Sequence, residues 1–355
     1  MRPHHGGNLE WAATIAHCAT TDILDFSASI NPLGPPSEVI SALEAALGQL
    51  GHYPDPLCTH LRHILSQIHH LDPPWILVGN GSAELLTWAA RELGEREQVW
   101  LVTPAFSDYG RALAAFGARV SRYPLINSSG QFQPDLQPLV RRLRSPLGVI
   151  LNSPHNPTGH LWSRSDLIPF LDSGALVVVD EAFMDFLPPE RDQTLISLVE
   201  EYPNLMILRS LTKFYALAGL RIGYVLTHPD RLARWQAWRD PWAVNSLALV
   251  AGVRSLGDRR FQEQTWAWLG SARDHLFAGL SAHGALTPWP SAANFILVES
   301  SISTSQLQRD LLTHHRILIR DCLSFPELGD LYFRVAVRSR AENERLLAAL
   351  DDLLL

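Results

Sequence analysis

The chain has 355 residues, of which 46% are hydrophobic and 18% are charged, so it has enough apolar material for a buried core and for two domains. A net charge of −7, with no basic cluster interleaved with aromatic residues, disfavours a nucleic-acid partner. No run of about 18 apolar residues predicts a membrane span, and residues 1–10 lack the apolar stretch of a signal peptide, so we expect a soluble, cytoplasmic protein.

The cysteines are few, odd in number and widely spaced: Cys18, Cys58 and Cys322. This pattern fits neither a disulfide framework nor a metal site. We therefore expect reduced cysteines and no bound metal.

The N-terminal segment, residues 1 to about 36, is rich in Gly, Pro, Asn and Ser, which favours an ordered loop over a helix or a strand. It contains the runs His5-Gly6-Gly7-Asn8 and Asp25-Phe26-Ser27-Ala28-Ser29-Ile30-Asn31-Pro32-Leu33-Gly34. The segment is either a surface arm that packs on the body or a place where backbone amides and His5 meet an anion. Apolar residues at helical spacing follow from Val39 to Leu47, and a turn follows at His52–Pro56.

From Trp75 onward, short apolar runs alternate with stretches of helical period such as Glu84–Leu93 and Tyr109–Phe116. We expect seven strands: Trp75–Gly79, Val99–Pro104, Arg119–Leu125, Leu147–Ser153, Leu176–Ala182, Leu205–Ser210 and Ile222–Thr227. This alternation predicts a mostly parallel sheet with helices on both faces. Such sheets bind ligands at the carboxyl ends of their strands.

Several of these strand ends carry polar or aromatic residues. The turn Gly79–Ser82 leads into a helix, where free amides bind anions such as phosphate, although such turns are often purely structural. Phe106 either stacks on a planar ring or belongs to the core, and two X-Pro turns hold Asn156 in its loop. Asp180 closes an apolar strand and needs a cation, because an unpaired buried carboxylate is costly.

Lys213 is the only lysine in the chain, since every other member of the 29 Lys and Arg residues is arginine. An amine can lose its proton and form a Schiff base with a carbonyl, and arginine cannot. Ser210 and Arg221 flank Lys213 in the pattern S-x-x-K, seven residues, R, and they offer a hydroxyl and a guanidinium to a phosphate. The alternative interpretation is a single residual surface lysine.

The motifs N-P-T-G at 156–159, D-E-A-F at 180–183 and S-L-T-K at 210–213 resemble, in this order, those of the fold-type I enzymes that use pyridoxal phosphate. The resemblance covers nearly the whole chain and implies an α/β fold, with a large domain built on a seven-stranded, mostly parallel sheet and a smaller α+β domain. It implies that Lys213 carries the cofactor, Asp180 pairs with the ring nitrogen, Asn156 bonds the ring hydroxyl and Phe106 stacks on the ring. It also implies that the cofactor phosphate is bound by Gly81, Ser82, Ser210 and Arg221.

The same resemblance gives Tyr53 the role of a tyrosine that reaches the cofactor phosphate of the neighbouring subunit, which implies a homodimer. We expect an arm and part of the small domain at 1–45, the large domain at 46–240 and the small domain at 241–355. In the last part we expect strands at Asn294–Glu299, Ile317–Arg320 and Tyr332–Val337. A final helix should follow, with Ser339 and Glu342 as a capping box.

Four local features resemble the threonine-phosphate decarboxylases of cobalamin synthesis: the arm runs quoted above, Ile317–Cys322, Phe333–Ser339 and Phe183, where histidinol-phosphate aminotransferases usually have tyrosine. The resemblance implies a small phosphorylated amino acid as substrate. Arg334 would bind its carboxylate, with Asn156 beside it. The phosphate would be bound by Arg320, His5, Gly6 and Gly7, with Asn31 nearby. For either arginine alone, a surface ion pair is the alternative.

This resemblance implies that anchoring the carboxylate and the phosphate at two points holds the carboxylate where its bond to Cα breaks, with Lys213 returning a proton to Cα. Two other functions stay open. Histidinol-phosphate transamination would use the same cofactor residues, and a binding module without catalytic activity would show no cofactor absorbance.

Overall fold

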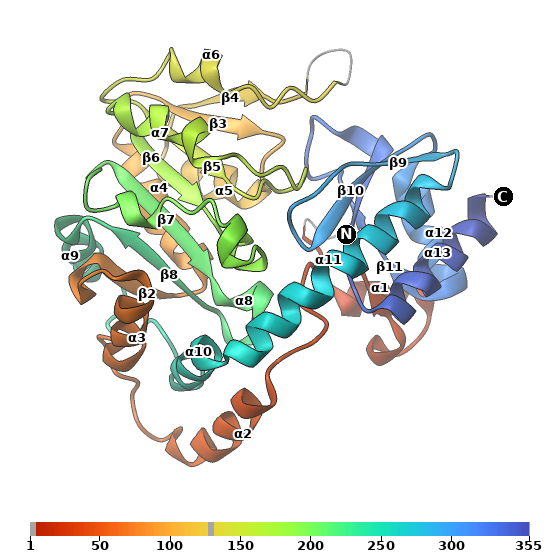
Figure 1. Cartoon of the computed structure of the whole chain (residues 1–355), viewed down its shortest axis with the longest axis horizontal. Helices are drawn as coiled ribbons and strands as arrows, with labels where there is room; N and C mark the ends of the chain where they lie inside the picture. Colours follow the sequence, from red (N-terminus) through yellow and green to blue (C-terminus); the bar gives the residue numbers. More distant parts are fainter. Residues whose placement is uncertain (1–4, 127–130, 355) are drawn as a thin grey trace.

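The larger of two main sheets forms the centre of the computed structural model, which describes residues 5–126 and 131–354 (Figure 1). Its strands in the described residues are β2 (Ile76–Asn80), β3 (Val99–Thr103), β4 (Val120–Pro124), β5 (Gly148–Asn152), β6 (Leu176–Asp180), β7 (Leu205–Ser210) and β8 (Ile222–Thr227). Their order is β2-β8-β7-β6-β5-β3-β4, and β8 alone runs against the others. The predicted seven-stranded, mostly parallel sheet is confirmed, with each strand within two residues of its predicted bounds.

Both faces of this sheet are covered, which explains why its strands are apolar throughout. In β6, Val178 packs in the cluster formed with α4 (Ser82–Gly94), α5 (Ser107–Ala115) and α9 (Pro229–Trp238). Its neighbours Val177 and Val179 pack on the other face, in the cluster that includes α7 (Arg164–Asp172) and α3 (Thr59–His69). A strand buried on both sides has no polar face, so it reads as a continuous apolar run.

A second sheet, of four strands, lies beside the first, at the right of Figure 1. Its order is β12-β13-β10-β9, with β9 (Leu286–Pro288), β10 (Phe295–Ser300), β12 (Arg320–Asp321) and β13 (Tyr332–Ala336). The helices of this region are α11 (Arg259–Ser281), α12 (Thr304–His315) and α13 (Arg340–Leu354). The capping box is confirmed, because Ser339 N donates to Glu342 Oε2 at 3.1 Å and Glu342 N donates to Ser339 Oγ at 3.4 Å.

The predicted strand Ile317–Arg320 is wrong as a single element. Residues Ile317–Leu318 form β11, which pairs in parallel with β1 (Leu24–Asp25), whereas β12 belongs to the four-stranded sheet. The short strand β9 was not predicted, because three residues are too few to show a period.

The prediction that residues up to about 36 form only loop is also wrong. Leu9–Ala16 form helix α1, whose first turn is capped by the Asn8 side chain accepting from Trp11 N at 2.9 Å. Ala12 and Ala13 pack against Leu312 of α12. Tertiary contact with α12 therefore stabilises a helix that the Gly-rich and Asn-rich composition of this segment did not predict.

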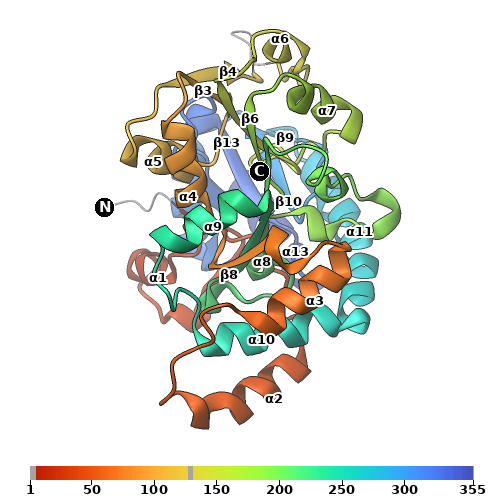
Figure 2. The same cartoon turned by 90° about the vertical axis from the view of Figure 1, so that its left-hand side faces the viewer.

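Helix α2 (Ser37–Ala46) packs against α10 (Ser246–Gly257), and α10 also contacts α3 and β8. Figure 2 shows α2, α3 and α10 together at the lower side of the molecule. The division at residues 45 and 240 stays a proposal, and these contacts place α10 beside the large sheet although it falls within 241–355. The other α-helices in the described part of the chain are α6 (Gln137–Val140) and α8 (Leu211–Phe214).

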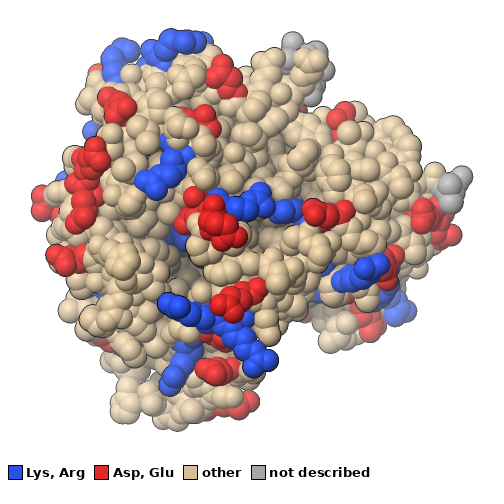
Figure 3. Space-filling model, viewed as in Figure 1, with Lys and Arg blue, Asp and Glu red and all other residues tan. Residues whose placement is uncertain are grey.

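The surface gives two further observations. On the face drawn in Figure 3, acidic and basic side chains are interspersed. Within residues 5–126 and 131–354, none of the helices combines the length and the apolar character that crossing a bilayer requires.

Candidate active site

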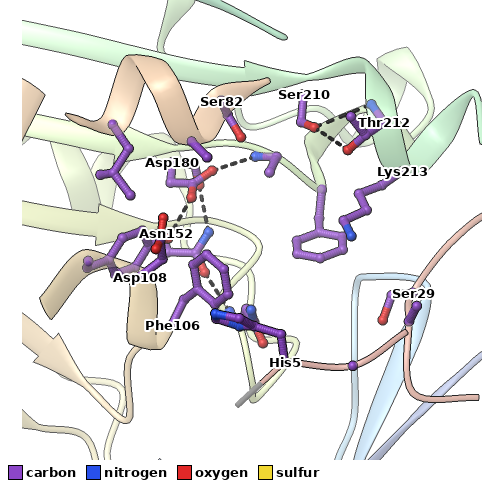
Figure 4. A pocket seen from close by; sticks show the side chains of 18 of the residues that line it. His5, Ser29, Ser82, Phe106, Asp108, Asn152, Asp180, Ser210, Thr212 and Lys213 are labelled. Atoms are coloured by element: carbon purple, nitrogen blue, oxygen red, sulfur yellow. Dashed lines mark hydrogen bonds between the residues drawn. The ribbon is translucent and has the colours of Figure 1, made fainter. Parts of the chain in front are cut away.

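A pocket lies at the carboxyl ends of β3, β5, β6 and β7, where the large sheet meets β12, β13 and the N-terminal arm (Figure 4). The predicted site residues that line it are His5, Gly6, Ser82, Phe106, Asn156, Asp180, Ser210, Lys213, Arg221, Arg320 and Arg334. The fold thus brings together residues more than 300 positions apart in the sequence.

Lys213 extends into this pocket from α8, directly after β7 (Figure 4). Burial lowers its pKa to about 8, helped by the positive charges of Arg334 and Arg221. Within the described residues, no hydrogen bond or ion pair occupies its amine. The amine is therefore available as a neutral nucleophile at a pH where an ordinary lysine is almost fully protonated.

Asp180 ends β6 as a buried carboxylate that receives only neutral donors. Tyr109 Oη donates to its Oδ2 at 2.6 Å and Ala182 N donates to its Oδ1 at 2.9 Å. Burial raises its pKa, and no ion pair involves it in the part of the chain that the structure describes. A buried carboxylate without a cation fits the predicted role of partner to a protonated ring nitrogen.

The turn between β2 and α4 is shaped for a phosphate group. Gly81 precedes α4 with φ of +76°, and a Cβ at this position would lie 2.6 Å from Arg221 Nη2. Glycine is therefore required for the guanidinium to approach the start of the helix, where Ser82 offers its amide. Ser210 lines the same pocket, and its Oγ shares a 2.7 Å hydrogen bond with Thr212 Oγ1. These groups fit the phosphate of the predicted cofactor.

Asn152, which was not predicted as a site residue, ties two predicted residues together. Its Oδ1 accepts from Asn156 N at 2.6 Å, and its Nδ2 donates to the Asp180 carbonyl at 2.7 Å. The loop of Asn156 and the end of β6 are thus held in one arrangement. Phe106 stands beside them and meets Tyr109 edge-on, with ring centroids 5.6 Å apart.

Arg320 and Arg334 face each other across the pairing of β12 with β13, and both are buried. Arg320 Nη2 donates to Ser324 Oγ at 2.7 Å, while Arg334 Nη1 donates to Asn156 Oδ1. Burial, and then Arg320, lower the pKa of Arg334 to about 10. Like charges directly opposite on adjacent strands are destabilising, so this pair favours an anionic ligand between or beside the two groups.

The N-terminal arm forms one wall of the pocket. The His5 ring lies 5.5 Å from the Phe106 ring, and Gly7 N donates to Ser27 Oγ at 2.8 Å. A Cβ on Gly6 would lie 2.2 Å from the Ser27 carbonyl oxygen, so only glycine allows this close approach. Gly7 lines a smaller neighbouring pocket that it shares with His5, Gly6 and Arg320, so its predicted place beside the substrate phosphate stays a prediction.

Asn31 does not line the pocket, although its backbone N donates to the Lys213 carbonyl at 3.0 Å, and its predicted place near the substrate phosphate stays a prediction. Its Nδ2 donates to the Phe214 carbonyl at 2.8 Å and to Thr265 Oγ1 at 2.9 Å, and its Oδ1 accepts from Leu33 N. With both protons of its amide nitrogen used in this way, Asn31 joins the arm to α8 and α11.

Tyr53 also lies outside its own chain's pocket. Its side chain is 78% exposed and its ring stacks on Trp242, with centroids 4.4 Å apart. A role at the phosphate requires a second chain, so the predicted contact across a dimer interface stays a prediction.

Other lining residues were also not predicted as site residues from the sequence, among them Ser29, Tyr109 and Phe325. Tyr109 could have been noticed three residues after Phe106, since this spacing puts both side chains on one face at the start of a helix. Nothing local in the sequence marks Ser29 or Phe325.

Residues 21–350 match the family model described as aminotransferase class I and II. The threonine-phosphate decarboxylase of Salmonella typhimurium is 41% identical over 99% of this chain and 96% of its own. The histidinol-phosphate aminotransferase of Symbiobacterium thermophilum is 34% identical over 93% and 90%. The structure of histidinol-phosphate aminotransferase from Sinorhizobium meliloti in complex with pyridoxal-5'-phosphate has a TM-score of 0.84, with 25% identity over 98% of this chain and 94% of that chain. With sequence, fold and strand-end pocket in agreement, this chain belongs to the class I and II aminotransferase family.

Proposed function

We propose that the protein uses pyridoxal phosphate to decarboxylate L-threonine O-3-phosphate, yielding (R)-1-aminopropan-2-yl phosphate and CO2 for the aminopropanol arm of cobalamin. The observation that carries this proposal is the buried pair Arg320 and Arg334, which adjoins Lys213 but is separate from the phosphate cradle at Gly81 and Arg221. A cofactor phosphate accounts for the cradle. A substrate with both a carboxylate and a phosphate accounts for the arginine pair. The name of the Salmonella relative supports the same substrate.

In this proposal the cofactor is held by the residues predicted for it. Lys213 would bind its aldehyde carbon, Asp180 would pair with its ring nitrogen, Asn156 would bond its ring oxygen and Phe106 would stack on its ring. Its phosphate is bound by Gly81, Ser82, Ser210 and Arg221. When bound, pyridoxal phosphate supplies an electron sink for the electrons of a broken bond to Cα.

The chain's own contribution is orientation and proton transfer. Arg334 binds the substrate carboxylate, with Asn156 at its side, while Arg320, His5, Gly6 and Gly7 bind the phosphate. Two anchored anions would fix the rotation of the substrate about Cα, so that the bond from Cα to the carboxylate is held in the position to break, rather than the bond from Cα to hydrogen. Lys213 Nζ then returns a proton to Cα, which its lowered pKa makes feasible near neutral pH.

A homodimer completes the site in this proposal, with Tyr53 of each chain reaching the cofactor phosphate of the other. Apolar side chains are exposed around α2 and the turn that follows it: Ile40, Leu47, Leu50, Leu57 and Trp242. Such a patch favours burial against a second copy. Mixing inactive Tyr53→Ala and Lys213→Ala chains should restore part of the activity, because some mixed dimers regain one complete site.

The deciding experiment supplies purified holoenzyme with L-threonine O-3-phosphate and measures CO2. Release of CO2 with formation of the amino alcohol phosphate supports the proposal. Consumption of histidinol phosphate with 2-oxoglutarate, and no CO2, would instead support the aminotransferase alternative. A binding module without catalytic activity would do neither and would lack the absorbance band at about 410–430 nm that the bound cofactor gives, a band that Lys213→Ala should abolish.

A further inference from the structure

Ser29 carries a buried hydroxyl that has no partner. The residue is 1% exposed and lines the pocket, and its Oγ makes no hydrogen bond within residues 5–126 and 131–354. Buried hydroxyls in native proteins nearly always have a partner, so an exception at a ligand pocket points to the ligand. In Figure 4 the Ser29 oxygen faces the pocket, on the side from which Lys213 enters.

The backbone around Ser29 is anchored, so the hydroxyl has a defined place. Asn294 Nδ2 donates to the Ser29 carbonyl at 3.0 Å, and Ile30 N donates to the Ala28 carbonyl at 2.9 Å. Asn294 precedes Phe295, the ring over which the Arg334 guanidinium lies at 4.6 Å. The loop that carries Ser29 is therefore tied to the structure that supports Arg334.

The other polar side chains of this loop are already occupied. Ser27 Oγ donates to Asp25 Oδ1 at 2.6 Å and accepts from Gly7 N, and the Asn31 amide is bound by α8 and α11 as described above. Of these loop side chains, Ser29 alone offers the pocket a free hydrogen-bonding group, among the residues that the structure describes.

We propose that Ser29 is a further substrate-binding residue, whose hydroxyl donates a hydrogen bond to the carboxylate of the substrate beside Arg334. This inference rests on the proposed function. The carboxylate is favoured over the phosphate because it is attached to Cα, the atom to which Lys213 returns a proton. The smaller pocket at the Arg320 end is lined by His5, Gly6 and Ser27 but not by Ser29. The pocket that Ser29 does line also contains Arg334 and Lys213, which favours the carboxylate as the partner of this hydroxyl.

The test compares Ser29→Ala with Ser255→Ala. Ser255 lies in α10, is fully buried, also has an unpartnered hydroxyl, and does not line the pocket. Removing a buried hydroxyl that bonds nothing is neutral or stabilising, so both variants should keep the melting temperature of the substrate-free holoenzyme.

The two variants should differ in ligand binding. Absorbance titration of the holoenzyme should show that Ser29→Ala weakens binding of L-threonine O-3-phosphate by about tenfold or more, the loss typical of a hydrogen bond to a charged group. Binding of the decarboxylated product, which has no carboxylate, should stay within about twofold of wild type. Ser255→Ala should change neither.

Other results would overturn the inference. Equal weakening of substrate binding and product binding would show that the hydroxyl contacts the phosphate or maintains the shape of the pocket. Unchanged binding of both would show that the hydroxyl contacts neither ligand. A melting temperature lowered by Ser29→Ala but not by Ser255→Ala would indicate a structural role. Each of these results leaves the wild-type enzyme active, whereas failure of the proposed function would appear as a wild type that does not bind or decarboxylate threonine phosphate.

Discussion

Replacing Tyr109 with phenylalanine tests whether Asp180 must be ionised opposite the cofactor. The variant keeps the ring that meets Phe106 and removes one of the two neutral donors to the carboxylate, the 2.6 Å hydrogen bond. Burial, and then the Asp180 charge, raise the pKa of Tyr109 well above its usual range, so the phenol is protonated and donates at any pH of interest.

The magnitude follows from what each state of Asp180 requires. A hydrogen bond to a charged group contributes about 1.5–3 kcal/mol. With the cofactor bound, Asp180 must stay ionised, so the variant loses the full free energy of this hydrogen bond. Without the cofactor, the raised pKa of Asp180 lets its carboxylate take up a proton, so the variant loses less free energy. Cofactor affinity should therefore fall by up to about 10- to 100-fold, since about 1.4 kcal/mol corresponds to a factor of ten.

The assay is titration of apoprotein with pyridoxal phosphate, followed by absorbance. Tyr202→Phe is the matched control, because Tyr202 Oη also donates to a carboxylate, Asp172, at 2.9 Å but does so on the surface. The control should bind the cofactor as wild type does. A Tyr109→Phe variant whose affinity stays within about twofold of wild type would refute the assigned role of Asp180.

Three further predictions concern the amine, the arginine pair and the aromatic wall. Only the neutral form of Lys213 attacks, and its pKa is about 8. The rate at which apoprotein captures pyridoxal phosphate should therefore rise with pH and level off above pH of about 8. A rate that still rises at pH 10 would show that Lys213 has the pKa of an ordinary lysine. Inorganic phosphate at about 100 times its dissociation constant should stabilise the holoenzyme by about 2.7 kcal/mol in thermal unfolding. The Arg320→Met variant should lose most of this stabilisation. Equal stabilisation of wild type and variant would show that the anion does not bind at Arg320. Phe183→Tyr adds a hydroxyl to a buried ring that meets Phe295 at 5.0 Å, and it should slow CO2 release while cofactor affinity is kept; unchanged release would mean that this position does not bear on reaction type.

Much of the large domain follows from local sequence, because hydrophobic period is a property of a few consecutive residues. The strands β2 to β8 were predicted within two residues, and Asp180 and Lys213 were located at strand ends, where parallel sheets bind ligands. Prediction failed where tertiary contact outweighs composition. Helix α1 forms because Ala12 and Ala13 pack against α12, and β11 forms because β1 lies beside it.

The substrate-binding part of the site shows the same limit of prediction from the sequence. Asn31 and Ser29 are both polar residues of one loop, and nothing in the sequence distinguishes them. Only the folded chain shows that partners from α8 and α11 occupy the Asn31 amide, while the Ser29 hydroxyl lacks a partner within the described residues.

By itself, the sequence determined which residues can do chemistry: one amine, one buried carboxylate at a strand end and a glycine turn before a helix. The tertiary structure alone decided which of them meet, and it placed Arg320 opposite Arg334 through the register of β12 and β13. The physical reason is that amine, acid and turn are set by neighbouring residues, whereas pairing, burial and free hydrogen-bonding groups depend on contacts between segments that are separate in the sequence.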